Sequence, residues 1–388
     1  MSSGGSSARG AGSNDADAPV AAAHRVLVVG ECLVDLAPAA PPQGQGAPQA
    51  QATAREQHAG EDDSPGLAKS PGSAATARAP NHQPRHQLVA LPGGGPANIA
   101  IGLARLEVPC DFAGRFSRGG FGPWLRQNMA DNGLGLRFSV DADEAATIAL
   151  VTLDDQGRAS YTFYGPTTAD WQWANDELPD LKDQGFGGRA VKAVHTGSLA
   201  LALEPGASVI AAWLTDLHRH SDVLISFDPN VRPGFVGDLS VYRDRLTSVV
   251  RSAHIVKAST DDLEAVFPGT SPRLVAEEWH SLGVPLVVIT EGPDGATAYH
   301  RSGACAHCSP PPINLADTIG AGDAFTSAFL AYFSRHGLLS PEAISGLAEA
   351  HLVSSLGDAV MASAFTCSRL GADPPSRSEL ARFIGQRA

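Results

Sequence analysis

The amino-acid sequence predicts an α/β protein, namely a Rossmann-like three-layer α/β/α domain that carries a small β-sheet lid. Short apolar runs rich in β-branched residues alternate with segments that have apolar residues at helical spacing. A hairpin pattern near residues 145–165 falls outside this alternation. A glycine-rich turn at 320–322 leads into a further helical pattern, and small residues before a helix are typical of an anion site.

Buried strands are predicted where apolar runs have strand length. These runs are Arg25–Gly30, Val191–His195, Val223–Phe227, His254–Lys257 and Pro285–Thr290. Helical spacing of apolar residues appears between them at 207–219, 240–252 and 272–282. Because strands and helices alternate, we expect one parallel sheet with helices on both of its faces.

The residues near 145–165 predict a hairpin, with Thr147–Leu153 and Ala159–Tyr164 joined by a polar turn. A hairpin does not easily join a parallel sheet. We therefore expect it to form a lid with strands at about 33–38 and 87–92. A lid of this kind would exclude water from a reacting phosphate.

Two stretches of the chain lack the apolar residues that a packed core needs. Residues 1–23 predict a disordered tail, and residues 39–86 predict a disordered low-complexity insertion. The insertion separates two segments with candidate functional residues, so we interpret it as a loop extension of one domain that spans 24–388.

The composition of the 388-residue chain excludes several classes of function. A formal net charge of -13 argues against a general nucleic-acid binder. No run of about 18 to 20 uncharged apolar residues predicts a membrane helix, and no secretory signal is visible. Five scattered cysteines favour a reducing compartment, so we expect a soluble cytoplasmic protein. Cys305 and Cys308 lack a second pair to complete a metal site, and we interpret them as incidental.

The glycine-rich turn supplies the strongest chemical signal. Its residues Gly320, Ala321 and Gly322 have almost no side-chain bulk, so a ligand can approach their backbone closely. The free N–H groups and the positive dipole end of the helix that starts there favour an anion. Asp323, in the first turn, would place a base beside that anion. The same residues fit an ordinary turn equally well, with Asp323 as a first-turn acid favoured by the dipole.

Two segments carry polar groups suited to sugar hydroxyls. The glycines Gly93, Gly94 and Gly95 free the backbone for close approach, and Asn98 can both donate and accept. A helix-start turn is the alternative. Glu31 and Asp35 flank a strand end, where open α/β sheets bind ligands. A solvated loop acid is the alternative, and it fits Glu31 better than Asp35.

A third segment follows the buried strand at 285–290. It contains Thr290, Gly292 and Gly295, whose backbone could meet nucleotide phosphates. A plain hairpin turn is the alternative interpretation.

Four motifs, in order, resemble the ribokinase-like (PfkB) family of carbohydrate kinases. Residues 317–330 are similar to the C-terminal signature of the family and 91–98 to its N-terminal signature. Residues 30–35 resemble its first strand with a sugar-binding aspartate, and 290–295 its nucleotide-phosphate turn. The resemblance implies a ribokinase-like fold and an ATP-dependent kinase that phosphorylates a primary hydroxyl with the help of Mg²⁺.

The substrate implied by the resemblance is a ketohexose. Phe163-Tyr164, Ala169-Asp170 and Asp228–Arg232 are most similar to the fructokinase branch, which implies that fructose is converted to fructose 6-phosphate. The alternatives are 2-keto-3-deoxygluconate, ribose or a nucleoside on the same fold. An alternative of another class is a non-catalytic sugar- or nucleotide-binding regulatory protein.

The resemblance also implies a role for each candidate residue. Asp323 is the implied base, beside the amides of Gly320, Ala321 and Gly322. The implied sugar contacts are Glu31, Asp35, Gly93, Gly94, Gly95, Asn98, Phe163 and Arg232. The implied nucleotide contacts are Ser259, Thr290, Gly292, Gly295 and Gly322.

Metal ions and a partner subunit are implied as well. Asp262 ends the segment that replaces an Asn-x-x-Glu motif of the family, so a contact with Mg²⁺ through water is implied. Asp317 and the Ile319 carbonyl match a K⁺ site of related kinases. Lid strands in this family often pair between subunits, which implies a homodimer.

Overall fold

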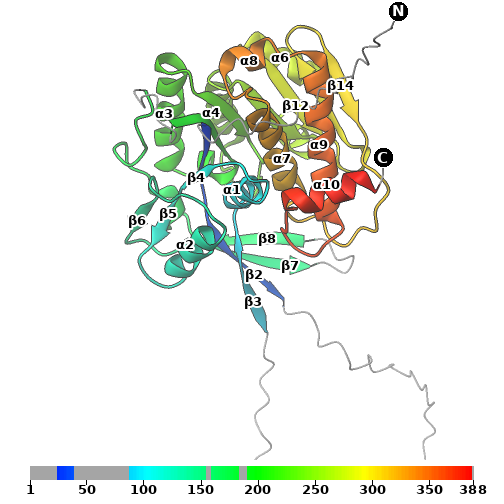
Figure 1. Ribbon diagram of the computed structural model, residues 1–388. Helices are drawn as coiled ribbons and strands as arrows, with labels where there is room; N and C mark the ends of the chain where they lie inside the picture. The colour runs from blue at the N-terminus through cyan, green and yellow to red at the C-terminus, as the bar shows by residue number, and fades with distance from the viewer. Residues whose placement is uncertain (1–23, 39–86, 154–158, 183–189, 387–388) are drawn as a thin grey trace, which may run out of the picture.

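The computed structural model describes residues 24–38, 87–153, 159–182 and 190–386. Its central feature is an eight-stranded sheet in the order β14-β13-β12-β11-β10-β9-β1-β4 (Figure 1). The strands are β1 His24–Val29, β4 Cys110–Ala113, β9 Ala190–Gly197, β10 Leu224–Asp228, β11 Ile255–Ser259, β12 Leu286–Thr290, β13 Ala296–His300 and β14 Cys305–Cys308. All five predicted strands are confirmed. The predicted tail and the 39–86 insertion lie outside the described residues.

The central sheet is not parallel throughout, so that expectation was wrong at one edge. Strands β4 through β12 pair in parallel, but β13 and β14 are antiparallel. The short turn Gly292–Asp294 between β12 and β13 explains the difference, because a parallel neighbour needs a crossover of a dozen or more residues.

Helices cover both faces of the sheet. They are α1 Gly95–Arg105, α2 Gly122–Asp131, α3 Gly206–His220, α4 Leu239–Val250, α5 Thr260–Val266, α6 Pro272–Ser281, α7 Ala321–Arg335, α8 Pro341–Ser345, α9 Glu349–Cys367 and α10 Arg377–Gly385. In β1, Val26 and Val28 face the core shared with α1, α7 and α9, whereas Leu27 and Val29 face the core shared with α3, α4 and α6. The predicted three layers and the three predicted helices are confirmed.

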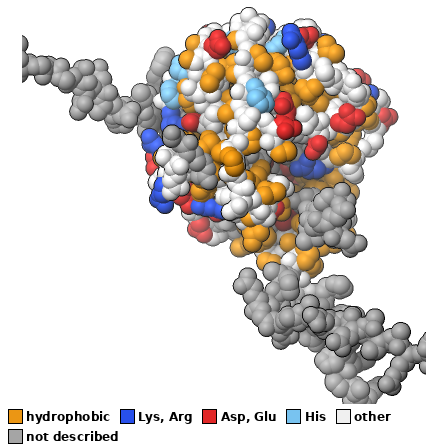
Figure 2. All heavy atoms as spheres, turned by 90° about the vertical axis from the view of Figure 1, so that its right-hand side faces the viewer, with side chains coloured by type: hydrophobic (Ala, Val, Ile, Leu, Met, Phe, Trp, Pro, Cys, Tyr) orange, Lys and Arg blue, Asp and Glu red, His pale blue; other side chains and the backbone are white. Residues whose placement is uncertain are grey.

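A second sheet lies apart from the central one, in the order β3-β2-β7-β8. Its strands are β2 Leu33–Pro38, β3 Leu88–Gly93, β7 Ile148–Leu153 and β8 Ala159–Tyr164, and Figure 1 shows them projecting below the main domain. The hairpin expected near 145–165 supplies β7 and β8. Apolar side chains gather toward this lower end of the molecule in Figure 2.

The remaining strands form a small two-stranded sheet, β5 Arg115–Ser117 with β6 Val140–Ala142. Within the described ranges, no helix combines the length and apolar character needed to cross a membrane.

Candidate active site

The glycine-rich turn starts α7, as the sequence predicts. Gly320 is the N-cap residue with a left-handed φ of 74°. A Cβ at Gly320 would lie 2.7 Å from the Cβ of Ala372, so both the backbone angle and the space favour glycine. The Ala321 N–H donates to the Thr318 carbonyl over 3.3 Å. The amides of Gly322 and Asp323 follow in the first turn, where α-helices leave N–H groups without an intrahelical partner.

Asp323 lies in the first turn of α7 and is half-buried. Its Oδ2 accepts a 2.9 Å hydrogen bond from Asn98 Nδ2, which comes from the first turn of α1. Burial raises the pKa of Asp323 to about 6, while the Asn98 hydrogen bond and the charge of Lys257 oppose the rise. The candidate base and the candidate sugar-binding asparagine are therefore in direct contact.

Gly95 separates Asp323 from the ends of two neighbouring strands. A Cβ on Gly95 would lie 3.4 Å from Asp323 Oδ1 and 3.3 Å from Asn230 Nδ2. The absence of a side chain at this position keeps the carboxylate approachable from the carboxyl edge of the sheet.

The second candidate acid is Asp35, on strand β2 of the smaller sheet. A Cβ on Gly93 would lie 2.2 Å from Asp35 Oδ2, so the carboxyl covers the glycine. Burial raises the pKa of Asp35 to about 6, and the negative charge of Asp323 adds to the rise. The two carboxyls are thus close enough to influence each other.

Glu31 is buried, with 1% of its surface exposed, so the alternative of a solvated loop acid is excluded, and a sugar contact of Glu31 stays a prediction. The turn before α1 covers it, because Gly94, with φ of 106°, lies directly on the Glu31 backbone. Burial raises the pKa of Glu31 to about 8, although a hydrogen bond with Ser198 opposes the rise.

The smaller sheet places Phe163 on the same face as Asp35. Asp35 pairs with Ala149, and Ala149 pairs with Phe163, so the three side chains form one cross-strand row. Phe163 meets Phe235 edge to face, with ring centroids 4.5 Å apart. Phe235 follows Arg232 and donates its N–H to the Arg232 carbonyl over 2.8 Å.

Arg232 itself is exposed, and its positive charge helps to lower the pKa of Asp323. Arg232 thus lies near both the base and the smaller sheet.

The candidate nucleotide residues lie farther along the same sheet edge. Ser259 and Thr290 are cross-strand neighbours at the ends of β11 and β12. Gly292 and Gly295 form the β12–β13 turn with φ of 57° and 107°. The alternative of a hairpin turn is therefore the observed local structure. A contact between this turn and nucleotide phosphates stays a prediction.

The candidate metal ligands are engaged by protein donors. The Asp262 carboxylate accepts from the Val231 N–H over 2.6 Å, from the Ser259 N–H over 2.8 Å and from the Ser259 hydroxyl over 2.6 Å. The residues therefore do not fit a direct Mg²⁺ site at Asp262. Across the described ranges, no group of three or more His, Cys, Asp or Glu side chains could hold a metal ion.

The carboxylate of Asp317 is also engaged by backbone amides, and it holds the loop before α7. Its Oδ1 accepts from the Thr318 and Ile319 amides over 2.7 and 3.1 Å, and its Oδ2 accepts from the Gly371 amide over 2.8 Å. Asp317 therefore joins the glycine-rich turn to the segment that follows α9. A K⁺ contact at Asp317 and Ile319 stays a prediction.

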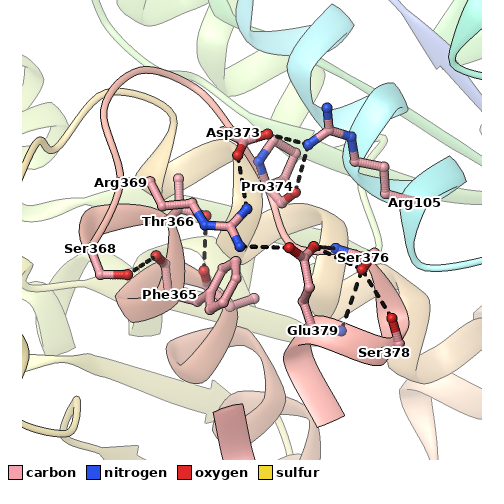
Figure 3. A network of polar contacts seen from close by, with 11 residues as sticks. Arg105, Phe365, Thr366, Ser368, Arg369, Asp373, Pro374, Ser376, Ser378 and Glu379 are labelled. Atoms are coloured by element: carbon pink, nitrogen blue, oxygen red, sulfur yellow. Dashed lines mark hydrogen bonds and ion pairs between the residues drawn. The ribbon is translucent and has the colours of Figure 1, made fainter. Parts of the chain in front are cut away.

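Figure 3 shows the polar network that holds this segment. Arg369 donates to Asp373 over 2.8 Å and to Glu379 over 2.6 Å. Arg105, at the end of α1, donates to the Pro374 carbonyl over 2.9 Å and also pairs with Asp373. The segment that packs on Gly320 is therefore tied to α1, whose other end carries Asn98.

Sequence reasoning missed a buried ion pair between Lys257 and Asp228, with 2.8 Å between Nζ and Oδ2. The available signal was a lysine within the apolar run at 254–257. It also missed Ser198 and Asn230, two non-glycine residues with positive φ of 57° and 38° that lie around Gly95. Strained backbone at a strand end is visible only in the structure, and such strain often accompanies function.

The arrangement gathers an anion-favouring helix start, a carboxyl with pKa near 6 and several polar groups that can hydrogen bond hydroxyls. This set suits phosphoryl transfer to a hydroxyl, because catalysis of that reaction rests on positioning and charge stabilisation. The structure brings together Glu31, Asp35, Gly93 to Gly95, Asn98 and Asp323.

Comparison with known proteins places these observations in context. A model described as "pfkB family carbohydrate kinase" matches residues 72–379. A fructokinase from Klebsiella pneumoniae is 31% identical over 265 residues, which cover 68% of this chain and 82% of that protein. The ATP-bound fructokinase from Xylella fastidiosa superposes with a TM-score of 0.74 at 22% identity, covering 94% of this chain and 98% of that one. A Vibrio cholerae fructokinase double mutant bound to fructose, ADP and potassium superposes with a TM-score of 0.69 at 22% identity, covering 94% of this chain and 98% of that one.

Proposed function

Because the chain belongs to the pfkB family of carbohydrate kinases, we propose that it is a fructokinase that transfers the γ-phosphate of ATP to the 6-hydroxyl of fructose. The ribokinase-like fold is confirmed, and so is the expected class, a phosphotransferase that acts on an alcohol group. Fructose is supported by relatives named fructokinase at about 30% identity. The single observation that carries the chemistry is the contact of Asp323 with Asn98 at the start of α7.

In the proposed reaction, Asp323 accepts the proton of the 6-hydroxyl as the sugar oxygen attacks the γ-phosphorus in line. The bond between the γ-phosphorus and the β–γ bridging oxygen breaks, and ADP leaves. The amides at the start of α7, with that of Gly322 foremost, stabilise the charge on the transferring group. A pKa of about 6 suits this task, because Asp323 is then mostly ionised at neutral pH and still basic enough to accept a proton.

Sugar recognition is assigned to the groups around Asp323. Asp35 and Asn98 would hydrogen bond hydroxyls, and the backbone at Gly94 and Gly95 allows the ring to lie close. Arg232 would contact both the sugar and the transferred phosphate, since a guanidinium binds oxyanions bidentately. Phe163 would contact the sugar from the smaller sheet, which we propose acts as a lid.

Nucleotide binding is assigned to the edge formed by β11 and β12. Ser259, Thr290, Gly292 and Gly295 lie there, and β11 also carries Lys257. Mg²⁺ would neutralise the ATP phosphates and enter with the nucleotide, because the oxygens of Asp262 are already engaged. A K⁺ site at Asp317 and Ile319 is supported by the potassium-bound relative, and exchange of K⁺ for Na⁺ in the assay would test it.

The state of assembly is a separate proposal. Leu88, Val89 and Leu91 on the edge strand β3 are 46%, 44% and 45% exposed. We propose that this lid edge is covered by a second copy in a homodimer, as exposed apolar strands favour pairing. Light scattering would show a dimer mass, and a monomer at micromolar concentration would contradict the proposal. A reducing cytoplasm is our proposed location, supported by the free thiols of all five cysteines.

A panel of sugars tests the proposed substrate. ADP release should be fastest with fructose, and it should be slower with ribose, 2-keto-3-deoxygluconate and adenosine. Turnover of one of these without turnover of fructose would reject the fructose assignment. ADP release at background with every compound would favour a non-catalytic binding protein.

A further inference from the structure

Lys257 is a buried cation whose position the proposed reaction does not yet explain. It lies on the central strand β11 and is 7% exposed. Its Nζ donates to Asp228 Oδ2 over 2.8 Å, and Asp228 ends the adjacent strand β10. A buried ammonium group is costly unless it is paired, so Asp228 explains how the charge is tolerated.

The ammonium group lies directly behind the phosphoryl-transfer turn. A Cβ built on Gly322 would lie 3.3 Å from Lys257 Nζ. Gly322 belongs to the first turn of α7, one residue before Asp323. Lys257 therefore adds a full positive charge to a helix start that already has a positive dipole end.

The groups around Asp323 are mostly acidic. Glu31 comes from the loop after β1, Asp35 from β2 and Asp228 from β10, while the cations are Lys257 on β11 and Arg232 after β10. The contact from α1 is the neutral amide of Asn98. Burial and Asp228 raise the pKa of Asp323, whereas Asn98, Lys257 and Arg232 lower it. Of these cations Lys257 is buried and Arg232 is exposed, so the field of Lys257 is screened less by solvent.

A neighbouring histidine does not compete for this role. His195 on β9 is buried and its Nδ1 shares a 3.0 Å hydrogen bond with Ser226. Burial and the charge of Lys257 lower the pKa of His195 to about 3, so it is neutral at physiological pH.

We propose that Lys257 is a positioning residue that keeps Asp323 ionised and the start of α7 electropositive, with Asp228 as the counter-charge that anchors it. The proposal rests on Asp323 as the base of the proposed kinase reaction. Burial disfavours the charge of Lys257, yet Asp228, Asp262 and Asp323 together overcome that effect and raise its pKa. Lys257 therefore stays protonated throughout the pH range in which Asp323 titrates.

The other explanation is a purely structural ion pair. The two explanations differ in the sign of a measurable shift, because Lys257 and Asp228 act on Asp323 in opposite directions. If the pair only supports the fold, removing either partner harms the enzyme in the same way. If it sets the charge state of Asp323, the two removals move the acid limb of the pH–rate profile apart.

The test compares Lys257→Met and Asp228→Asn with the wild-type enzyme. One measures kcat/KM for fructose from pH 5 to 9 at saturating Mg²⁺-ATP, and records the melting temperature of each variant. In Lys257→Met the acid limb should shift to higher pH by about one unit. At the pH of the wild-type midpoint of that limb, kcat/KM should then fall several-fold further than it does at pH 9. In Asp228→Asn the acid limb should stay at the wild-type pH or shift to lower pH. Lys257→Arg, which keeps the charge, should restore the wild-type limb.

Limbs that move in the same direction in Lys257→Met and Asp228→Asn, or a limb that stays in place in Lys257→Met, would overturn the proposal. If Lys257→Met does not fold, the other two variants provide the test. A shift of the acid limb to higher pH in Asp228→Asn or in Lys257→Arg would reject the role of Lys257. Near-normal turnover in Asp323→Ala would reject the proposed base instead. That result separates a failure of the proposed reaction from a failure of this inference.

Discussion

The two ends of the candidate site are built differently. The proposed phosphate end consists of the start of α7, with Gly320, Gly322 and Asp323 within four consecutive positions, backed by the central sheet. The proposed sugar end draws Glu31, Asp35, Asn98, Phe163 and Arg232 from separate segments of the chain. It also includes part of the smaller sheet, whose outer strand β3 exposes apolar residues.

The difference explains how the two ends are expected to respond to mutation. At the phosphate end, charges and helix geometry are held by a packed core, so a change there should affect the chemical step. At the sugar end, the groups depend on how the smaller sheet sits against the main domain, so a change there should affect binding of the sugar. The kinetic parameters kcat and KM therefore separate the two ends.

The largest effect is expected at the phosphate end from Asp323→Ala. Loss of the general base should lower kcat by about 10²-fold or more, with little change in binding of ATP. Turnover and ATP affinity are measured on the same preparation. Asp244→Ala, an exposed acid on α4 outside the candidate site, serves as the matched control and should retain its kcat. A normal kcat in Asp323→Ala would remove the distinction between the two ends.

A second large effect concerns stability at the sugar end. The pKa of Glu31 rises from its ordinary value of 4.5 to about 8 in the folded protein, so the folded state binds more protons than the unfolded state between these values. Stability should then fall as pH rises from about 4.5 to 8, by an amount on the order of a few kcal/mol.

Glu31→Gln removes this titration and should flatten the dependence, so that the variant gains melting temperature relative to wild type at pH 8 but not at pH 5. Thermal unfolding at both pH values gives the comparison. Equal changes at the two pH values would mean that Glu31 is charged in the folded protein.

An intermediate effect is expected from Gly93→Ala. The new methyl group would lie 2.2 Å from Asp35 Oδ2, so the carboxyl must move away from its place in the proposed sugar site. The KM for fructose should rise about tenfold, which corresponds to the loss of one good hydrogen bond, while kcat changes less. Gly119→Ala, where a methyl group meets no atom within 4 Å, is the control. A fall in kcat with an unchanged KM would contradict the assignment of Asp35 to the sugar.

Features built from contiguous residues could be predicted from the sequence, whereas features built from distant segments could not. The strands, the three-layer core and the start of α7 were predictable, because each is encoded in contiguous residues with a clear period or turn signal. The antiparallel direction of the edge strands β13 and β14 could not be predicted, because apolar periodicity does not give strand direction. Burial of Glu31 was missed because it depends on the turn at Gly94, more than sixty residues farther along the chain.

The candidate site was predicted in outline but not in its charges. Family resemblance indicated Asp35, Asn98 and Asp323, and the structure brings them together. The partnership of Lys257 with Asp228 could not be predicted, because it depends on the neighbouring positions of β10 and β11 in the sheet. Nor does any sequence signal show that the oxygens of Asp262 are already engaged by Val231 and Ser259.

The smallest effect should come from the aromatic contact between the smaller sheet and the main domain. Phe163 and Phe235 meet edge to face, and such a pair contributes about 0.5–1.5 kcal/mol beyond its buried area. Phe163→Ala and Phe235→Ala should each raise the KM for fructose about threefold to tenfold with kcat nearly unchanged. Because Phe235 acts through its contact with Phe163, the double variant should be little worse than Phe163→Ala alone, as a double-mutant cycle would show. Additive effects would mean that the two rings act independently and that the smaller sheet is positioned by other contacts.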